Sequence, residues 1–155
     1  MKKIKEERRK ELESNLNQFP HKISTNVKFA DVDSFGVVHN IKYFYWLEWA
    51  RTEYLRSIGV NLNKNTFLTE LPLMVVHAEI DYFNSAEFDD EIEIFSRVFA
   101  VKDSSLVFEN IIRKNGETLI ANAKAVLVHI DPETNQSIRI PDDLRIKIDN
   151  YQNNQ

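Results

Sequence analysis

Residues 31–56 read DVDSFGVVHNIKYFYWLEWARTEYLR, a stretch in which an acidic, glycine-containing loop leads directly into a long aromatic helix. The helix is predicted from about Ile41 to Ser57, because apolar residues recur every three or four positions along it. Gly59 follows at the position where glycine commonly ends a helix. One long helix, followed by residues that read as strands, decides the fold class.

Asp33 lies seven residues before the expected helix start near Asn40. The first turn of a helix offers unpaired backbone N–H groups and a partial positive charge. A carboxylate facing such donors across a small gap is suited to attack on a polarised carbonyl group. The alternative interpretation is a loop whose aspartates cap turns, with Asn40 as an ordinary helix N-cap.

The composition indicates a single soluble domain. The chain has 155 residues, enough to bury a genuine core. Its formal net charge of -4 predicts no general affinity for nucleic acids, and the absence of cysteine excludes disulfides and thiolate chemistry. No apolar run reaches the roughly 18 residues of a membrane span, and the basic N-terminus lacks the apolar segment of a secretory signal. We therefore expect a cytoplasmic protein without stable membrane insertion.

Three zones are expected along the chain. Residues 1–20 form a charged helical extension that ends at Pro20. Residues 21–148 form the domain, and the polar residues 149–155 form a disordered tail. Within the domain we expect strands at residues 23–30, 73–83, 91–101, 106–113 and 118–130, with a further short edge strand at 137–140. The Asn115-Gly116 pair predicts a tight hairpin between two of these strands.

Consecutive strands joined by short turns indicate an antiparallel sheet. The long helix must cover its apolar face, and Ala121, Ala123 and Ala125 would let that helix approach closely. The predicted class is therefore α+β, with a curved antiparallel sheet of five to six strands wrapped round one central helix. Because pairing of strand edges between two subunits would cover an exposed edge, we also expect a dimer.

Several motifs occur in order over most of the chain: DVD at 31–33, GVV at 36–38, EWARTEYLR at 48–56, AEIDY at 78–82 and VLV at 126–128. From about Ser24 to Leu144 the chain resembles the hotdog-fold acyl-CoA thioesterases. The resemblance is to the branch similar to 4-hydroxybenzoyl-CoA thioesterase and the Tol-Pal-associated thioesterases. It implies a hotdog fold, hydrolysis of an acyl-CoA to a free acid and coenzyme A, and a homodimer or homotetramer. The charged extension before Pro20 is not part of the family pattern.

The resemblance assigns catalytic roles to two positions. Asp33 corresponds to the family's catalytic carboxylate, which acts either as a nucleophile or as a general base on water. The backbone N–H of Asn40, at the helix start, corresponds to the group that polarises the thioester carbonyl. No cofactor is expected beyond the coenzyme A of the substrate, and the histidines show no metal-ligand spacing.

Four further residues are expected to bind the substrate: Gly36, Val37, His39 and Tyr43. Gly36 would let the loop backbone pass close to the acyl-CoA. His39 lies beside the helix start and could touch the acyl group or water, although a structural role is the alternative. Tyr43 could line the acyl pocket, although an aromatic residue on a helix is also typical of a core.

Other charged residues are interpreted as structural or remain open. Asp31 is interpreted as structural, and Glu48 and Arg51 are spaced to pair on one face of the helix. Candidates for contact with the coenzyme A phosphates include Arg97, Lys102, Arg113 and Lys114. The acyl group can be aromatic or aliphatic. The alternative functions are a thioesterase acting on acyl carrier protein and a non-catalytic acyl-CoA-binding or scaffold protein with the same fold.

Overall fold

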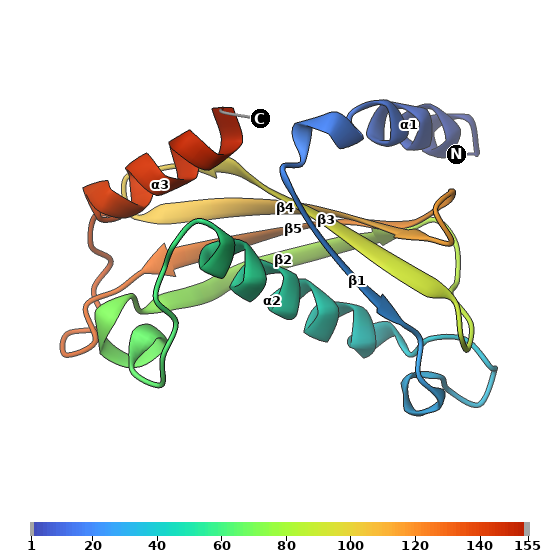
Figure 1. Ribbon diagram of the computed structural model, residues 1–155, viewed down its shortest axis with the longest axis horizontal. Helices are drawn as coiled ribbons and strands as arrows, with labels where there is room; N and C mark the ends of the chain where they lie inside the picture. The colour runs from blue at the N-terminus through green and yellow to red at the C-terminus, as the bar shows by residue number, and fades with distance from the viewer. Residues whose placement is uncertain (1, 154–155) are drawn as a thin grey trace.

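The computed structural model describes residues 2–153, which form one five-stranded sheet and three α-helices (Figure 1). The order across the sheet is β1-β3-β4-β5-β2, and all neighbouring strands are antiparallel. The predicted antiparallel α+β class is confirmed, with five strands, because residues 137–140 contribute only an isolated bridge from Ser137 to Ile130. The strands are β1 (His21–Asn26), β2 (Leu73–Tyr82), β3 (Glu91–Val101), β4 (Ser105–Lys114) and β5 (Thr118–His129).

The hairpin between β4 and β5 shows how local sequence sets the register of the sheet. Asn115 and Gly116 adopt positive φ angles of 51° and 74°, and the Glu117 N–H donates to the Lys114 carbonyl at 3.1 Å. Asn-Gly tolerates two successive left-handed residues better than most pairs. The turn closes the pairing of Lys114 with Thr118 and so aligns the two strands along their length.

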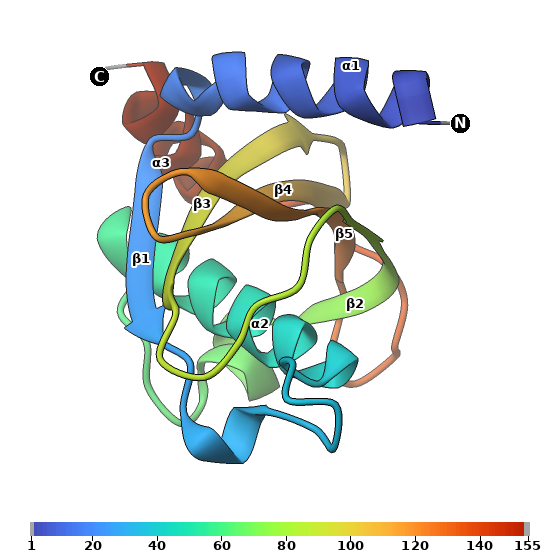
Figure 2. The ribbon, with the colours of Figure 1, turned by 90° about the vertical axis from the view of Figure 1, so that its right-hand side faces the viewer.

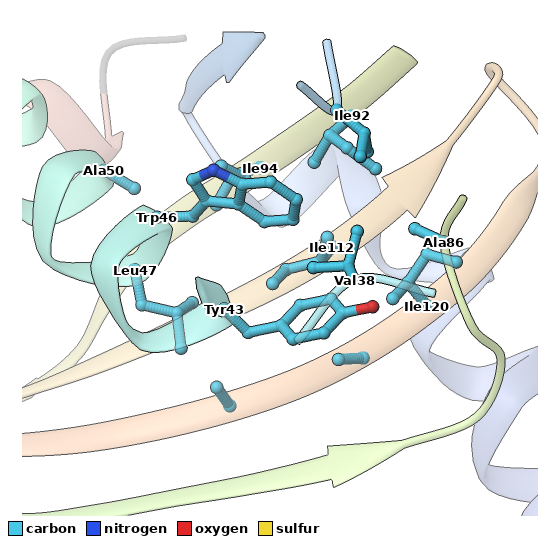
Figure 3. Close-up of a cluster of buried hydrophobic side chains, with 13 residues drawn as sticks. Val38, Tyr43, Trp46, Leu47, Ala50, Ala86, Ile92, Ile94, Ile112 and Ile120 are labelled. Carbon is cyan, nitrogen blue, oxygen red and sulfur yellow. The ribbon is translucent and has the colours of Figure 1, made fainter. Parts of the chain in front are cut away.

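The helix α2 (Asn40–Ser57) packs against one face of the sheet, and its bounds agree with the predicted helix to within one residue. Ala121 and Ala123 of β5 are buried beneath it, and their small side chains leave room for the larger ones of the helix. Figure 3 shows this cluster, which includes Tyr43, Trp46, Leu47, Ala50, Ile94, Ile112 and Ile120.

The helix α1 (Lys2–Ser14) lies on the opposite face of the sheet from α2 (Figures 1 and 2). Leu12 and Leu16 pack onto a small cluster formed by Phe19, Ile111 and Leu119. Ile111 and Leu119 directly precede Ile112 and Ile120, which belong to the cluster beneath α2. Because successive side chains of a strand point to opposite faces, Ile111 and Leu119 face α1. The charged N-terminal helix is therefore packed on the domain.

The helix α3 (Asp142–Asn153) holds the C-terminal residues against the domain. Tyr151 meets Tyr54 edge to face, with ring centroids 5.4 Å apart. The Gln152 amide donates to the Val98 carbonyl at 2.8 Å and accepts from the Val98 N–H at 2.6 Å. The expectation of a disordered tail is therefore corrected for residues 149–153, and residues 154–155 lie outside the described part of the chain.

Three short helical turns connect these elements: η1 (Leu16–Gln18), η2 (Phe29–Asp31) and η3 (Thr66–Glu70). The first strand was expected to reach Ala30 but ends at Asn26, because η2 turns the chain out of the sheet. This turn delivers the chain into the loop that precedes α2.

Candidate active site

The loop before α2 folds back on itself as a short hairpin. Val32 and Val38 form an antiparallel bridge. The Asp33 N–H donates to the Val37 carbonyl at 2.8 Å, and Gly36 makes the turn with a φ of 78°. Glycine adopts this conformation without the steric cost that a side chain would bring. The hairpin therefore holds Asp33 beside Val37, close to the start of the helix.

The Asp33 side chain is partly buried, and one of its oxygens is engaged locally. Oδ1 accepts from the Phe35 N–H at 2.8 Å, the geometry of an Asx turn. Within residues 2–153 the other oxygen, Oδ2, has no hydrogen bond or ion pair. The local interaction fixes the carboxylate and leaves one oxygen available to a substrate or a water molecule.

His39, rather than Asn40, is the N-cap of α2, which corrects the sequence interpretation. Its Nδ1 accepts from the Ile41 N–H at 3.3 Å, so the neutral ring carries its proton on Nε2. Asn40 is the first helical residue, and its backbone N–H has no partner among the described residues. The helix start thus presents an unused N–H group and the positive end of its dipole.

Asp31 anchors the base of the hairpin, in agreement with its structural interpretation. It is 5% exposed, and its carboxylate lies 2.8 Å from the Lys42 ammonium and 3.0 Å from the Lys28 N–H. Burial alone would raise the pKa of the Asp31 carboxyl group. The hydrogen bonds from Lys42 and Lys28 outweigh burial and hold the pKa below its ordinary value.

Lys42→Met is expected to destabilise the folded protein by about 2 kcal/mol at pH 7, because it leaves a buried carboxylate without its cation. The folded-state pKa of Asp31 lies below its unfolded value. The stabilisation is therefore present above about pH 4 and is lost as pH falls through the folded-state pKa. Urea unfolding at several pH values should show the difference from wild type shrinking in acid. Lys64→Met, on an exposed loop residue, is the control, and a pH-independent difference would exclude the ion pair.

A pocket of about 330 Å³ opens beside the helix start, between α2 and the end of β2. The Tyr82 hydroxyl donates to the Asn40 carbonyl at 3.1 Å, and its ring meets that of Tyr43 edge to face at 5.2 Å. Burial raises the pKa of Tyr43 to about 12, so its hydroxyl is neutral at physiological pH. The lining residues are Val38, Asn40, Tyr43, Tyr82, Phe83, Asn84 and Ser85.

The structure brings the predicted site residues together in two groups. Asn40 and Tyr43 line the pocket itself. Asp33, Gly36, Val37 and His39 lie on the adjoining hairpin, which is joined to the segment after β2 by the Val37–Glu87 bridge and by a hydrogen bond from the Val38 N–H to the Ala86 carbonyl. Tyr82 was not singled out from the sequence, although its motif AEIDY was, because only the three-dimensional fold places it over Asn40.

Three of the candidate phosphate contacts are already engaged by carboxylates. Arg97 pairs with Glu109 at 2.6 Å, Arg113 with Glu93 at 2.7 Å, and Lys114 with Asp90 at 2.9 Å. Two further statements hold for residues 2–153. No group of three or more His, Cys, Asp or Glu side chains there could hold a metal ion. No helix there is long and apolar enough to cross a membrane.

A model of the thioesterase-like superfamily matches residues 27–148. The chain is 36% identical over 104 residues to the acyl-CoA thioesterase YbgC of Haemophilus influenzae, covering 66% of this chain and 74% of that protein. A thioesterase from Thermus thermophilus, crystallised with coenzyme A and Zn, matches with a TM-score of 0.76 and 26% identity, over 87% of this chain and 96% of the other. A 4-hydroxybenzoyl-CoA thioesterase mutant, crystallised with 4-hydroxybenzoyl-CoA, shares the fold at 18% identity, with a TM-score of 0.76 over 83% of this chain and 97% of the other.

The family match spans almost the whole of the predicted domain. It includes the hairpin with Asp33, the start of α2 and the strand that carries Tyr82. The expectation of a thioester hydrolase is thereby confirmed, and the chain belongs to the thioesterase-like superfamily.

Proposed function

We propose that this protein hydrolyses an acyl-CoA thioester at the junction of the hairpin and α2. The observation that carries the proposal is that Asp33, with one oxygen available, lies on the hairpin that leads into the unused Asn40 N–H, and that Asn40 lines a pocket. A thioester is a suitable substrate for one carboxylate and one N–H donor, because its carbonyl is electrophilic and its thiolate leaves without strong acid assistance. One carboxylate and a positioned donor are then sufficient, and no cofactor is required.

Two routes are compatible with this arrangement. In the nucleophilic route an Asp33 oxygen attacks the carbonyl carbon, the C–S bond breaks, and water hydrolyses the resulting acyl–aspartyl anhydride. In the general-base route Asp33 takes a proton from the attacking water and returns it to the departing thiolate. In both routes the Asn40 N–H donates to the carbonyl oxygen as that oxygen becomes negative.

The substrate pocket is proposed to be completed in a homodimer that pairs through β2. This strand lies at the edge of the sheet and is exposed along most of its length. Among the ion pairs of the described residues, none joins Glu48 to Arg51 of α2, contrary to the expectation from their spacing. Both side chains border a second pocket of about 150 Å³ beside β2. The exposed large apolar side chains of α2 and β2 include Ile41, Phe44, Tyr45, Trp49, Met74, Val75 and Val76. Such a dimer would also be the core of a homotetramer.

The function is tested by measuring thiol release from a panel of short-chain, long-chain and aromatic acyl-CoAs. Turnover of one class would support the proposal and identify the acyl group. If the protein hydrolyses the same acyl group only when acyl carrier protein carries it, the substrate is an acyl carrier protein thioester and not an acyl-CoA. Binding of acyl-CoA without turnover of either substrate would support a non-catalytic role.

The polarising role of the Asn40 N–H can be isolated with a pair of substitutions. Proline fits the first position of a helix and removes only the N–H, and His39 before it already has the extended ψ of 133° that a residue before proline requires. Asn40→Pro is expected to lower kcat about a hundredfold, whereas Asn40→Ala keeps the N–H and should cost less than about threefold. Equal losses in thiol-release assays of the two variants would assign the role to the amide side chain.

A further inference from the structure

The N-terminal helix α1 contacts the back of the strand that forms one wall of the pocket. Leu12 and Leu16 pack in the same cluster as Phe83, which is also one of the pocket-lining residues. Figure 2 shows α1 running across the strands on the side away from α2. The family match begins at residue 27 and so does not include α1.

Arg8 links α1 to two strands at this point. Its guanidinium lies 2.8 Å from the Asp81 carboxylate on β2 and donates to the Asn122 side-chain oxygen on β5 at 3.1 Å. Asn122 is itself buried and donates to the Asn110 carbonyl on β4. Arg8 therefore ties the end of the edge strand to the interior of the sheet.

Tyr82, the residue after Asp81, has its side chain on the opposite face of β2. Tyr82 points toward α2, where its hydroxyl donates to the Asn40 carbonyl at 3.1 Å. Asp81 pairs with Asn122 and Tyr82 with Ala121, and these pairs end the ladder between β2 and β5. An edge strand has a partner on one side only, so its last residues are the most prone to fray.

We infer that α1 braces the pocket wall, and that Arg8 is a positioning residue that acts through Asp81 and Tyr82 on the helix start at Asn40. The inference rests on the proposed thioesterase function where it concerns turnover. Exposed ion pairs contribute little to global stability. A restraint on one fraying strand end can nevertheless matter, because catalysis is sensitive to small displacements of the groups that surround the reacting atoms.

The test compares Arg8→Ala with Arg9→Ala in the chain of 155 residues. Arg9 is the matched control, because it pairs with Glu6 and Glu13 inside α1. Hydrogen exchange of residues 78–86 should become at least about fivefold faster in Arg8→Ala and should not change in Arg9→Ala. Unchanged exchange in Arg8→Ala would overturn the brace, whether or not the protein turns over acyl-CoA.

Kinetics provide the second readout. In Arg8→Ala we expect kcat to fall between about threefold and tenfold with little change in KM. Reversing the pair, with Arg8→Asp and Asp81→Arg together, should restore most of the loss that either change causes alone. In a double-mutant cycle with Tyr82→Phe, Arg8→Ala should cause little further loss of kcat. The Tyr82 hydroxyl, through which Arg8 is proposed to act, is already absent in that background.

Four outcomes separate this inference from the proposed function. Additive losses from Arg8→Ala and Tyr82→Phe, or no rescue by the reversed pair, would overturn the positioning role of Arg8. An active wild type with an unaffected Arg8→Ala would do the same and leave the thioesterase proposal standing. An inactive wild type would overturn the proposed function alone, and hydrogen exchange would then decide the brace.

Discussion

Asp33→Asn is expected to lower kcat for acyl-CoA hydrolysis by at least about a thousandfold while leaving the fold intact. Asparagine cannot act as a nucleophile or as a general base at neutral pH, so both proposed routes lose their central group. The hairpin should survive, because the asparagine Oδ1 can still accept the hydrogen bond that Oδ1 of Asp33 receives from the Phe35 N–H. The assay is thiol release under saturating acyl-CoA, with circular dichroism as the check on folding.

Asp89→Asn is the matched control for this experiment. Asp89 lies in the neighbouring loop between β2 and β3, and its positive φ of 69° is one that asparagine tolerates well. The Asp89→Asn substitution removes the same charge from the same end of the molecule and should leave kcat nearly unchanged. Retention of activity within a few-fold in Asp33→Asn would remove Asp33 from the mechanism. In the wild type, a burst of thiol that exceeds free acid would favour the nucleophilic route.

Val76→Asp is expected to convert the proposed dimer to a monomer. Val76 is 57% exposed, on the open edge strand, and the proposed pairing would bury it. The twofold symmetry of a dimer places the new charge at the interface twice. Burying two unpaired carboxylates should cost at least about 4 kcal/mol, or roughly a thousandfold in Kd. Sedimentation velocity across a range of protein concentrations measures this shift.

The control for the dimer experiment is Ile146→Asp. Ile146 is 59% exposed but lies on α3, away from β2. The same chemical change there should leave association untouched. A Val76→Asp protein that still sediments as the wild type does would exclude pairing through β2. If the monomer folds but has lost turnover, the pocket at the end of β2 depends on the second subunit.

Features set by short stretches of sequence were predictable. The helix α2 was located to within one residue because its periodic apolar face and its terminal Gly59 are local signals. The Asn115-Gly116 turn was found for the same reason. The neighbourhood of Asp33 and Asn40 also follows from local sequence, since they are only seven positions apart. Their chemical roles came from the family resemblance and stay predictions.

Features that depend on distant contacts were not predictable. Tyr82 reaches the Asn40 carbonyl from a strand 42 residues further along the chain, and only the pairing of β2 with β5 places it there. The C-terminal residues have a polar composition that suggests disorder. They form a helix because Gln152 bonds to Val98, 54 residues away, and to the Tyr54 hydroxyl. The N-cap was misassigned because His39 uses its ring nitrogen for a role more often taken by asparagine.

The contact of Gln152 with Val98 restricts which edges of the sheet can pair with another copy of the chain. On the β1 side, the first strand is short and polar and begins only after Pro20. Before its start, the Gln152 amide occupies the backbone groups of Val98 on β3. On the other side, β2 offers ten residues of open, largely apolar edge. If other copies of the chain could pair with both edges of the sheet, the pairing would continue from copy to copy and form a filament. With the β1 side restricted in this way, the proposed pairing through β2 would stop after two copies and give a closed dimer.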